Sequence, residues 1–279
     1  MKLLTNETDY DKTIGLAKEL NDSYNKAVIF HAYWNGPLNE KHFMSVKSCW
    51  YFNIKNYSNR KIIVWLENNS LNEWNEKISE FAEINYFNLN SEIENTPLEN
   101  KRFYYNRQLS FYSDVVRYIL LYKYGGCWFD LDVFFLRDFS PLFSAYENEV
   151  LVYQWERQNY PNGAIYISLV PQNNKIKDII EFIIQRNKGW GFQEADLTYD
   201  LELDMLVLPC SWFDGSWLGN VNIECDAFFQ SSDKTHTFEN FFNGSFCYHW
   251  HNRWNHLIHE KSPIKQLYDI ILNDDSKKN

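Results

Sequence analysis

The hydrophobic residues of the chain fall into short runs separated by longer amphipathic segments. The short runs predict buried β-strands at residues 27–34, 61–66, 84–89, 150–155, 164–169 and 205–210. The amphipathic segments predict helices at residues 39–56, 71–83, 106–124 and 174–187, and residues 127–136 are predicted to form one strand or two short ones. Strands that alternate with helices are typical of an α/β fold with a largely parallel sheet, whose ligands bind beyond the carboxyl ends of the strands.

Local signals mark where two of these helices begin or end. Asn39 is a favourable N-cap for the helix at residues 39–56. Gly125 and Gly126 follow the helix at residues 106–124, and we expect them to end it and to reverse the chain, because glycine tolerates positive φ.

Two carboxylates lie inside the apolar segment "GGCWFDLDVFF" (125–135). A buried carboxylate is costly unless a cation or a basic side chain compensates its charge. In a strand, Trp128, Asp130 and Asp132 point to the same face, where the two carboxylates repel each other. A divalent cation relieves that repulsion, and oxygen-rich sites suit Mg²⁺ or Mn²⁺. Asp-x-Asp alone is a weak signal, but behind an apolar helix and a double glycine it predicts a metal site.

Asp114 and Arg117 lie three residues apart in the helix that precedes the glycines, so they share one helix face. One interpretation is a structural salt bridge within a largely buried helix. The other is that both side chains reach into a cleft and bind hydroxyl groups.

Aromatic and imidazole side chains supply further candidates. His249 and His251 alternate within "CYHWHNRWN" (247–255); a single histidine is usually structural, but together with the acidic pair one of them is a candidate metal ligand. Trp34 lies just beyond the first predicted strand. It is either an aromatic anchor or a platform on which a nucleobase stacks.

Composition and charge narrow the classes of partner and compartment. The net charge of −10 argues against a nucleic-acid partner. The five cysteines show no CxxC spacing, which favours a reducing, cytoplasmic compartment over a disulfide framework or a zinc cage. The sequence has neither a signal peptide nor an apolar run of the ~18 residues that span a bilayer, although nothing in it argues against peripheral membrane association. Without a linker, we expect a single domain over residues 1–272 and a flexible tail over residues 273–279.

The segment "SDVVRYILLYKYGGCWFDLDVFFLRDFSPLF" (113–143) resembles the DXD-containing sugar-binding region of retaining glycosyltransferases. That group includes yeast-type mannosyltransferases, capsular polysaccharide synthesis enzymes and the large clostridial glucosylating toxins. "FHAYWNGPLN" (30–39), "KIIVWLENN" (61–69) and "YHWHNRW" (248–254) are similar to further elements of the same family.

The resemblance implies a GT-A fold, a Rossmann-like nucleotide-binding sheet with flanking helices. It implies a metal-dependent retaining enzyme that transfers a hexose from a nucleotide-sugar to a glycan acceptor, and by resemblance alone the donor class is UDP-hexose. The toxin-like alternative is a protein acceptor. The implied catalytic residues are Asp114, Arg117 and Asp130, which bind the donor together with Trp34. Asp132, Asp130 and His249 are implied to hold Mn²⁺ or Mg²⁺.

The sequence departs from the family in two places. Arg253 stands where many members have serine before the final tryptophan, which leaves His251 and Asn252 as rivals to His249 for the third metal ligand. Trp128 stands where many members have tyrosine, so it has no hydroxyl to offer. One carboxylate of an acidic segment in the second half of the chain is a candidate to face the acceptor, and we expect the others to be solvated surface charges. The segment contains Glu194, Asp196, Asp200, Glu202 and Asp204.

Two other classes of protein share part of this pattern. A phosphatase of the haloacid-dehalogenase type also uses Asp-x-Asp after a strand, with the first aspartate as nucleophile. There a threonine or valine commonly follows two places after the second aspartate, where this chain has Phe134. A non-catalytic carbohydrate-binding module would explain the aromatic residues but not a metal-type acidic pair.

Overall fold

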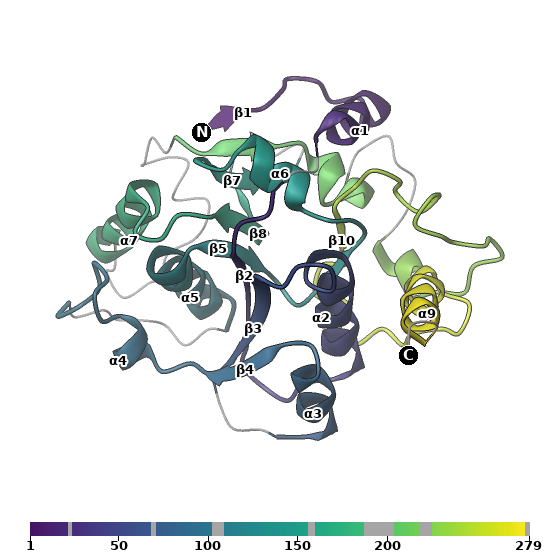
Figure 1. The fold of residues 1–279 in the computed structure, drawn as a ribbon, viewed down its shortest axis with the longest axis horizontal. Coiled ribbons are helices and arrows are strands. Elements are labelled where there is room, and N and C mark those ends of the chain that lie inside the picture. Colours follow the sequence, from purple (N-terminus) through teal and green to yellow (C-terminus); the bar gives the residue numbers. More distant parts are fainter. Residues whose placement is uncertain are drawn as a thin grey trace.

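The computed structural model describes residues 1–21, 24–67, 71–101, 109–155, 160–186, 204–217 and 225–276. Its strands are β1 (Lys2–Leu3), β2 (Val28–Trp34), β3 (Arg60–Leu66), β4 (Glu83–Tyr86), β5 (Gly126–Phe129), β6 (Val133–Phe135), β7 (Val150–Tyr153), β8 (Asn162–Ser168), β9 (Leu206–Leu208) and β10 (Cys247–His249). Eight of them form one sheet with the order β1-β9-β7-β8-β5-β2-β3-β4, and β6 pairs with β10 in a second, two-stranded sheet (Figure 1).

The large sheet is mostly parallel, as the alternation of strands and helices predicted. The exception is β8, which runs antiparallel to both of its neighbours, β7 and β5. The apolar run that forms β8 carries no sign of its direction, because a strand buried on both faces is hydrophobic throughout in either orientation.

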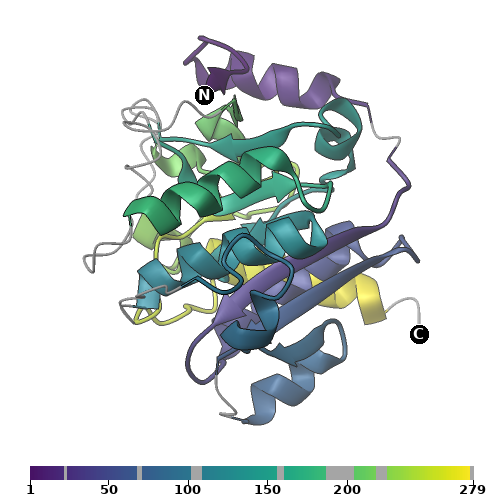
Figure 2. The same ribbon diagram turned by 90° about the vertical axis from the view of Figure 1, so that its left-hand side faces the viewer.

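Helices cover both faces of the large sheet (Figures 1 and 2). They are α1 (Tyr10–Glu19), α2 (Glu40–Asn53), α3 (Glu73–Ser79), α4 (Leu89–Glu92), α5 (Leu109–Tyr124), α6 (Ser140–Ala145), α7 (Asn174–Arg186) and α9 (Pro263–Ser276). Helices α5 and α7 pack on one face, and α2 and α6 pack on the other. Helix α9 lies outside α2, over a third apolar cluster that includes residues of β6 and β10.

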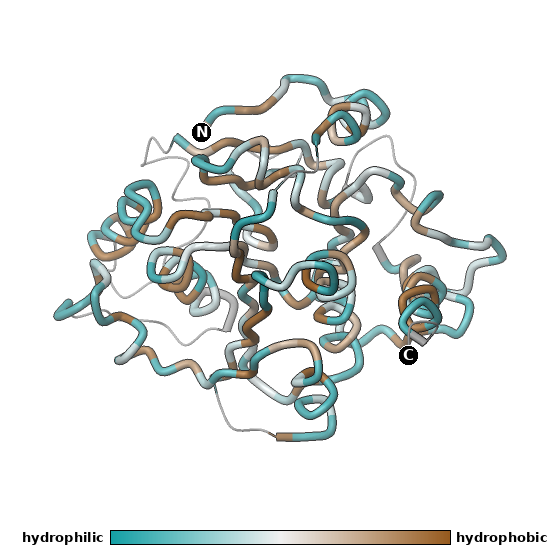
Figure 3. The backbone as a smooth tube through the Cα atoms, viewed as in Figure 1, coloured by the Kyte–Doolittle hydropathy of each residue, from teal (hydrophilic) through white to brown (hydrophobic). Residues whose placement is uncertain are grey.

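Hydrophobic residues concentrate where these layers meet (Figure 3). The strands at the centre of the tube are mainly hydrophobic, whereas the outer turns are mainly hydrophilic. Alternate residues of β5 face opposite layers: Cys127 and Phe129 join the cluster beneath α2, and Trp128 joins the cluster beneath α5. The DXD segment therefore starts from a strand that is fixed on both sides.

The predicted helix boundaries at Asn39 and at the double glycine are confirmed. Asn39 Oδ1 accepts hydrogen bonds from the backbone N–H groups of Lys41 and His42, at 3.0 and 3.3 Å. Gly125 and Gly126 have φ values of 65° and 109°, and a Cβ on Gly126 would lie 2.1 Å from a backbone oxygen. Glycine is therefore required at this turn by both conformation and space.

Several predicted bounds were wrong at their ends. Helix α3 stops at Ser79 rather than residue 83, and β4 ends at Tyr86 rather than residue 89. Helices α1, α4, α6 and α9 were not predicted. Residues 106–108, the start of the helix predicted for 106–124, lie outside the described residues.

The expected flexible tail is helical over its first residues, because α9 continues to Ser276. Its acidic groups are held by lysines of α2 and the turn that follows it: Asp275 lies 2.6 Å from Lys47 Nζ, and Asp274 lies 3.2 Å from Lys55 Nζ. These ion pairs hold the polar sequence "NDDS" against the rest of the chain, which its composition alone does not predict.

Candidate active site

The DXD residues occupy a turn at the carboxyl end of β5. Strand β5 ends at Phe129, and residues 130–132 lead into β6, which belongs to the other sheet. The expectation that Asp130 and Asp132 share one strand face was therefore wrong. The chain leaves β5 at Asp130, whose backbone N–H still donates to Ala164 O at 2.9 Å, and the two carboxylates acquire different surroundings.

Asp130 is paired with the arginine of α5. Arg117 is 2% exposed, and its Nη2 lies 3.0 Å from Asp114 Oδ1 and 3.6 Å from Asp130 Oδ1. Trp128 Nε1 donates a hydrogen bond to Asp130 Oδ1 at 2.7 Å. Trp128 has no hydroxyl group, unlike the tyrosine of many family members, but its indole N–H contacts the first aspartate of the motif. Burial and the charge of Asp132 raise the pKa of Asp130, against the opposing effect of Arg117.

The guanidinium group of Arg117 is confined by the backbone of β8. A Cβ on Gly163 would lie 2.4, 2.5 and 2.7 Å from three of its atoms. Gly163 therefore provides the space in which Arg117 reaches both carboxylates. The salt bridge of Arg117 with Asp114 is thus present, and Arg117 also lies beside Asp130.

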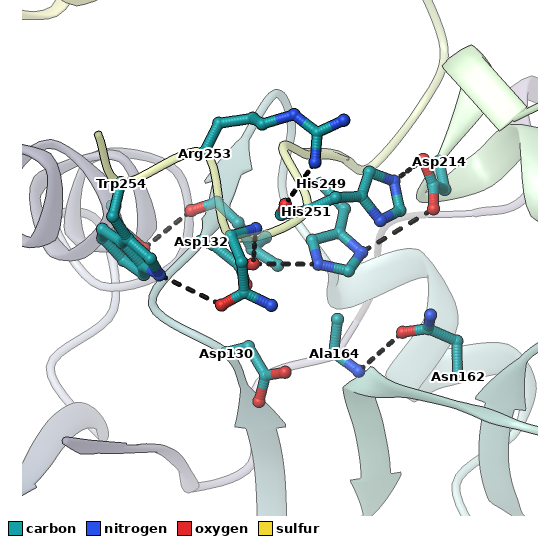
Figure 4. A network of polar contacts seen from close by, with 12 residues as sticks. Asp130, Asp132, Asn162, Ala164, Asp214, His249, His251, Arg253 and Trp254 are labelled. Atoms are coloured by element: carbon teal, nitrogen blue, oxygen red, sulfur yellow. Dashed lines mark hydrogen bonds and ion pairs between the residues drawn. The ribbon is translucent and has the colours of Figure 1, made fainter. Parts of the chain in front are cut away.

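Asp132 is 3% exposed and contacts the segment around β10 (Figure 4). Its Oδ2 lies 3.2 Å from His249 Nε2 and accepts a hydrogen bond from the backbone N–H of Asn252 at 2.7 Å. Burial disfavours the charged form of Asp132, but His249 and this N–H together hold its pKa below the ordinary value.

The other ring nitrogen of His249 faces a second buried carboxylate, Asp214. His249 Nδ1 lies 3.0 Å from the Tyr153 hydroxyl and 3.7 Å from Asp214 Oδ2. Asp214 Oδ1 lies 3.0 Å from His251 Nε2, and Trp155 Nε1 donates to Asp214 Oδ2 at 2.8 Å. Burial opposes protonation of His249, but Asp132 and Asp214 together raise its pKa well above the ordinary value.

This arrangement separates the three rivals for the third metal ligand. His249 is the imidazole beside Asp132, whereas His251 Nε2 turns to Asp214. Asn252 contacts Asp132 through its backbone, and its side-chain Oδ1 accepts a hydrogen bond from Trp254 Nε1 at 3.0 Å. The geometry therefore favours His249.

Three site residues were not found from the sequence: Asp214, Tyr153 and Asn162. Asn162 lies at the start of β8, beside the DXD turn, and its Oδ1 accepts a hydrogen bond from Ala164 N at 2.8 Å (Figure 4). Tyr153 is the last residue of β7 and Asp214 follows β9, and both strands run in the same direction as β5, so the two residues lie at the same sheet edge as Asp130. A position at or beyond the carboxyl end of a strand was the sequence signal that could have identified them as site residues.

Trp34 ends β2 at this edge and is half-buried. Its ring centroid lies 4.3 Å from that of His42 and 4.9 Å from that of Trp254, and its Nε1 donates to Pro37 O at 3.2 Å. The tryptophan therefore joins an aromatic group contributed by β2, α2 and the segment after β10. A part of the ring is left exposed, as a stacking role requires.

The ligands around Asp132 fit a divalent cation. Two carboxylates and one imidazole are ligand types found at Mn²⁺ and Mg²⁺ sites. Bonds of about 2.1 Å in octahedral geometry place neighbouring ligand atoms about 3 Å apart, close to the 3.2 Å between Asp132 Oδ2 and His249 Nε2. Asp130 is 32% exposed, so its carboxylate is also accessible to a ligand.

The acidic segment expected to face the acceptor lies mostly outside the described residues, including Glu194, Asp196, Asp200 and Glu202. Asp204 is described, and its side chain is 81% exposed and 3.2 Å from Lys175 Nζ. It is a surface charge. Every helix in the described part of the chain is too short or too polar to span a bilayer.

Comparison with known proteins identifies the class of this site. Residues 40–152 match the family of glycosyltransferase sugar-binding regions containing a DXD motif. The segment spans α2 to β7 and includes Asp114, Arg117, Asp130 and Asp132. This part of the chain is therefore similar to the sugar-binding region of DXD glycosyltransferases. No curated protein sequence matches it.

The fold is that of GT-A glycosyltransferases. The glycosyltransferase GlyE of Streptococcus pneumoniae TIGR4 superposes with a TM-score of 0.51 at 12% identity, over 91% of this chain and 64% of that one. The galactosyltransferase LgtC in complex with donor and acceptor sugar analogues gives a TM-score of 0.47 at 14% identity, over 88% and 96%. The PaToxG glycosyltransferase gives 0.40 at 16% identity, over 67% and 71%. This chain spans less than two thirds of the length of GlyE.

Proposed function

We propose that this glycosyltransferase transfers a hexose from a UDP-sugar to a glycan acceptor, with retention of anomeric configuration and dependence on a divalent cation. The observations that support this proposal most directly are the contact of Asp132 with His249 at the carboxyl edge of the sheet and the contact of Asp130 with the Arg117–Asp114 pair. The turn of residues 130–132, called the acidic turn below, offers carboxylates to a metal ion, and the guanidinium group of Arg117 lies beside it. A metal ion and a fixed positive charge both suit a sugar that is linked to a diphosphate.

The side chains divide the work of binding between the two ends of the donor. In this proposal Trp34 stacks on the base. Arg117, Asp114 and Asp130 hold hydroxyl groups of the sugar, and the two ion pairs of Arg117 fix its guanidinium group before the donor arrives. Preorganised groups in a dry site stabilise developing charge without reorganisation.

Asp132, Asp130 and His249 would hold Mn²⁺ or Mg²⁺. Such an ion, when bound, neutralises charge that develops on the leaving diphosphate. The carboxylate of Asp132 is ionised before a metal ion binds, because His249 and the Asn252 N–H lower its pKa. The residues of this chain that support the acidic turn therefore prepare it for a cation.

A screen of donors with and without Mn²⁺ tests the proposal. Thermal stabilisation by nucleoside diphosphates and nucleotide-sugars identifies the donor, because a ligand that binds the folded state raises the unfolding temperature. We expect UDP-hexoses to stabilise the protein only with Mn²⁺, and to be hydrolysed or transferred slowly.

Asp132→Asn should abolish both effects in a protein that still folds, although the loss of its buried pair with His249 lowers the metal-free unfolding temperature. Asp269→Asn is the matched control, because Asp269 lies on α9 with a side chain 43% exposed. Full activity of Asp132→Asn at low Mn²⁺ would refute the metal assignment. Transfer to proteins but not to glycans would favour the toxin-like alternative.

A further inference from the structure

A second group of potential metal ligands lies on the far side of His249 from the acidic turn. Asp214, His249 and His251 each offer one ligand atom, and these atoms all lie within 4.8 Å of one another. Asp214 is fully buried, and the His249 and His251 side chains are 8% and 9% exposed. The three residues come from the turn after β9 and from β10 and the residues that follow it.

The spacing of these atoms suits a tetrahedral ion. Zn²⁺ bonds to nitrogen and oxygen are about 2.0–2.1 Å, which places neighbouring ligand atoms about 3.3 Å apart. Asp214 Oδ1 lies 3.0 Å from His251 Nε2, and the other carboxylate oxygen, Oδ2, lies 3.7 Å from His249 Nδ1, so the two imidazoles approach the same carboxylate at distances near that value. The Tyr153 hydroxyl, 3.0 Å from His249 Nδ1, or a water completes a fourth position.

We propose that Asp214, His249 and His251 form a second metal site, selective for Zn²⁺ and similar ions. Two imidazoles and one carboxylate prefer Zn²⁺, Co²⁺ or Ni²⁺ over Mn²⁺ and Mg²⁺, whereas the acidic turn has the opposite preference. The two sites therefore differ in the ion that they select.

The two sites share His249, so they exclude each other; this part of the inference rests on the proposed function. A neutral imidazole has one lone pair. When His249 Nε2 serves the acidic turn, Nδ1 carries the proton and faces Asp214. When Nδ1 binds an ion with Asp214 and His251, Nε2 carries the proton and donates to Asp132.

Charge supports a single ion in either place. Asp132 and Asp214 lie on opposite sides of His249 and together carry two negative charges. One divalent cation balances them at either site. Zn²⁺ is therefore an inhibitor that acts by withdrawing His249 from the acidic turn.

Titration of the metal-free full chain with Co²⁺, followed by visible absorption, tests the second site, because tetrahedral Co²⁺ absorbs much more strongly than octahedral Co²⁺. We expect the wild-type protein to bind one such ion and His251→Asn to bind it at least tenfold more weakly. Asparagine suits the φ of 52° at this position, and His251→Gly is a second variant that tolerates it. His256→Asn is the matched control, because His256 is 38% exposed and lies near Asp226.

Competition tests the sharing of His249. Free Mn²⁺ is measured by electron paramagnetic resonance while Zn²⁺ is added. We expect Zn²⁺ to release Mn²⁺ one for one, and His251→Asn to keep wild-type Mn²⁺ affinity while needing at least tenfold more Zn²⁺ for release.

Equal Co²⁺ affinity of the wild type and both His251 variants would overturn the second site, and simultaneous binding of Mn²⁺ and Zn²⁺ would overturn the sharing. Failure of Mn²⁺ to bind the wild-type protein would instead contradict the proposed function, while the Co²⁺ comparison would still decide the second site.

Discussion

Gly163→Ala tests how closely the position of Arg117 is tied to catalysis. The new methyl group would lie 2.4–2.7 Å from three guanidinium atoms, while ordinary contacts between such atoms are about 3.5 Å. The guanidinium must therefore retreat by about 1 Å, away from its 3.0 and 3.6 Å contacts with Asp114 and Asp130. The site keeps all of its residues but loses their alignment.

The expected effect on turnover is large, and the effect on stability is moderate. A misplacement of about 1 Å can cost about 100-fold in rate, which corresponds to about 2.7 kcal/mol. Overpacking costs about 1–3 kcal/mol of stability, but alanine recovers about 0.4–1 kcal/mol because it restricts the unfolded chain more than glycine does. We therefore expect the net loss of stability to be at most about 2.5 kcal/mol.

The assay compares three proteins: the wild type, Gly163→Ala and Gly15→Ala. Gly15 lies in α1 with no atom within 4 Å of an added Cβ, so its substitution makes the same chemical change in open space. Turnover is measured at saturating donor, UDP affinity by calorimetry, and stability by thermal unfolding. We expect Gly163→Ala alone to lose turnover, with UDP affinity changed less than threefold. If its turnover equalled that of Gly15→Ala, the placement of Arg117 beside the donor sugar would be wrong.

Three further predictions concern individual residues. Arg117→Ala should reduce turnover far more than affinity for free UDP, measured by the same two assays; loss of UDP binding would indicate a structural role in α5. Trp34→Ala should weaken donor binding about ten- to a hundredfold, because stacking contributes about 1–3 kcal/mol, and Trp34→Phe should recover part of that affinity. If donor affinity were unchanged and the unfolding temperature strongly lowered, Trp34 would be a core anchor. Burial lowers the pKa of His31 to about 4, so the unfolded chain takes up a proton that folded His31 does not. Stability should therefore fall as pH drops from about 6.5 towards 4, by about 1.4 kcal/mol per pH unit from this group, and denaturant titrations of His31→Gln should show a correspondingly weaker pH dependence.

The sequence predicted those parts of the fold that local chemistry determines. The Asn39 cap, the double glycine turn and the apolar strands each follow from a few neighbouring residues, and each is present. The direction of β8 could not be predicted, because it depends on which strands lie beside it. Helix α9 was missed for a similar reason: its polar end is held by Lys47 and Lys55, which are more than two hundred residues away in the sequence.

The candidate site also contains residues that a local motif identifies and residues that only contacts distant in the sequence bring together. Asp114, Arg117, Asp130 and Asp132 lie within one continuous motif, and the structure places Arg117 between Asp114 and Asp130. Asp214 carries no local motif, and only the pairing of β9 with β7 brings it to the same edge. The choice among His249, His251 and Asn252 depends on backbone direction after β10, where His251 and Asn252 have φ values of 52° and 57°. Neighbouring residues alone do not set that path.

The pairing of β6 with β10 also determines when, during synthesis, the contact between Asp132 and His249 can form. Asp132 and His249 are 117 residues apart in the chain. A ribosome that adds about 5–20 residues per second needs about 6–23 s to make the interval between them. Throughout that time the emerging acidic turn lacks its imidazole partner and the strand that anchors it. A nascent chain therefore cannot bring Asp132 and His249 together until residue 249 has left the ribosome, even where the parallel strands have already folded.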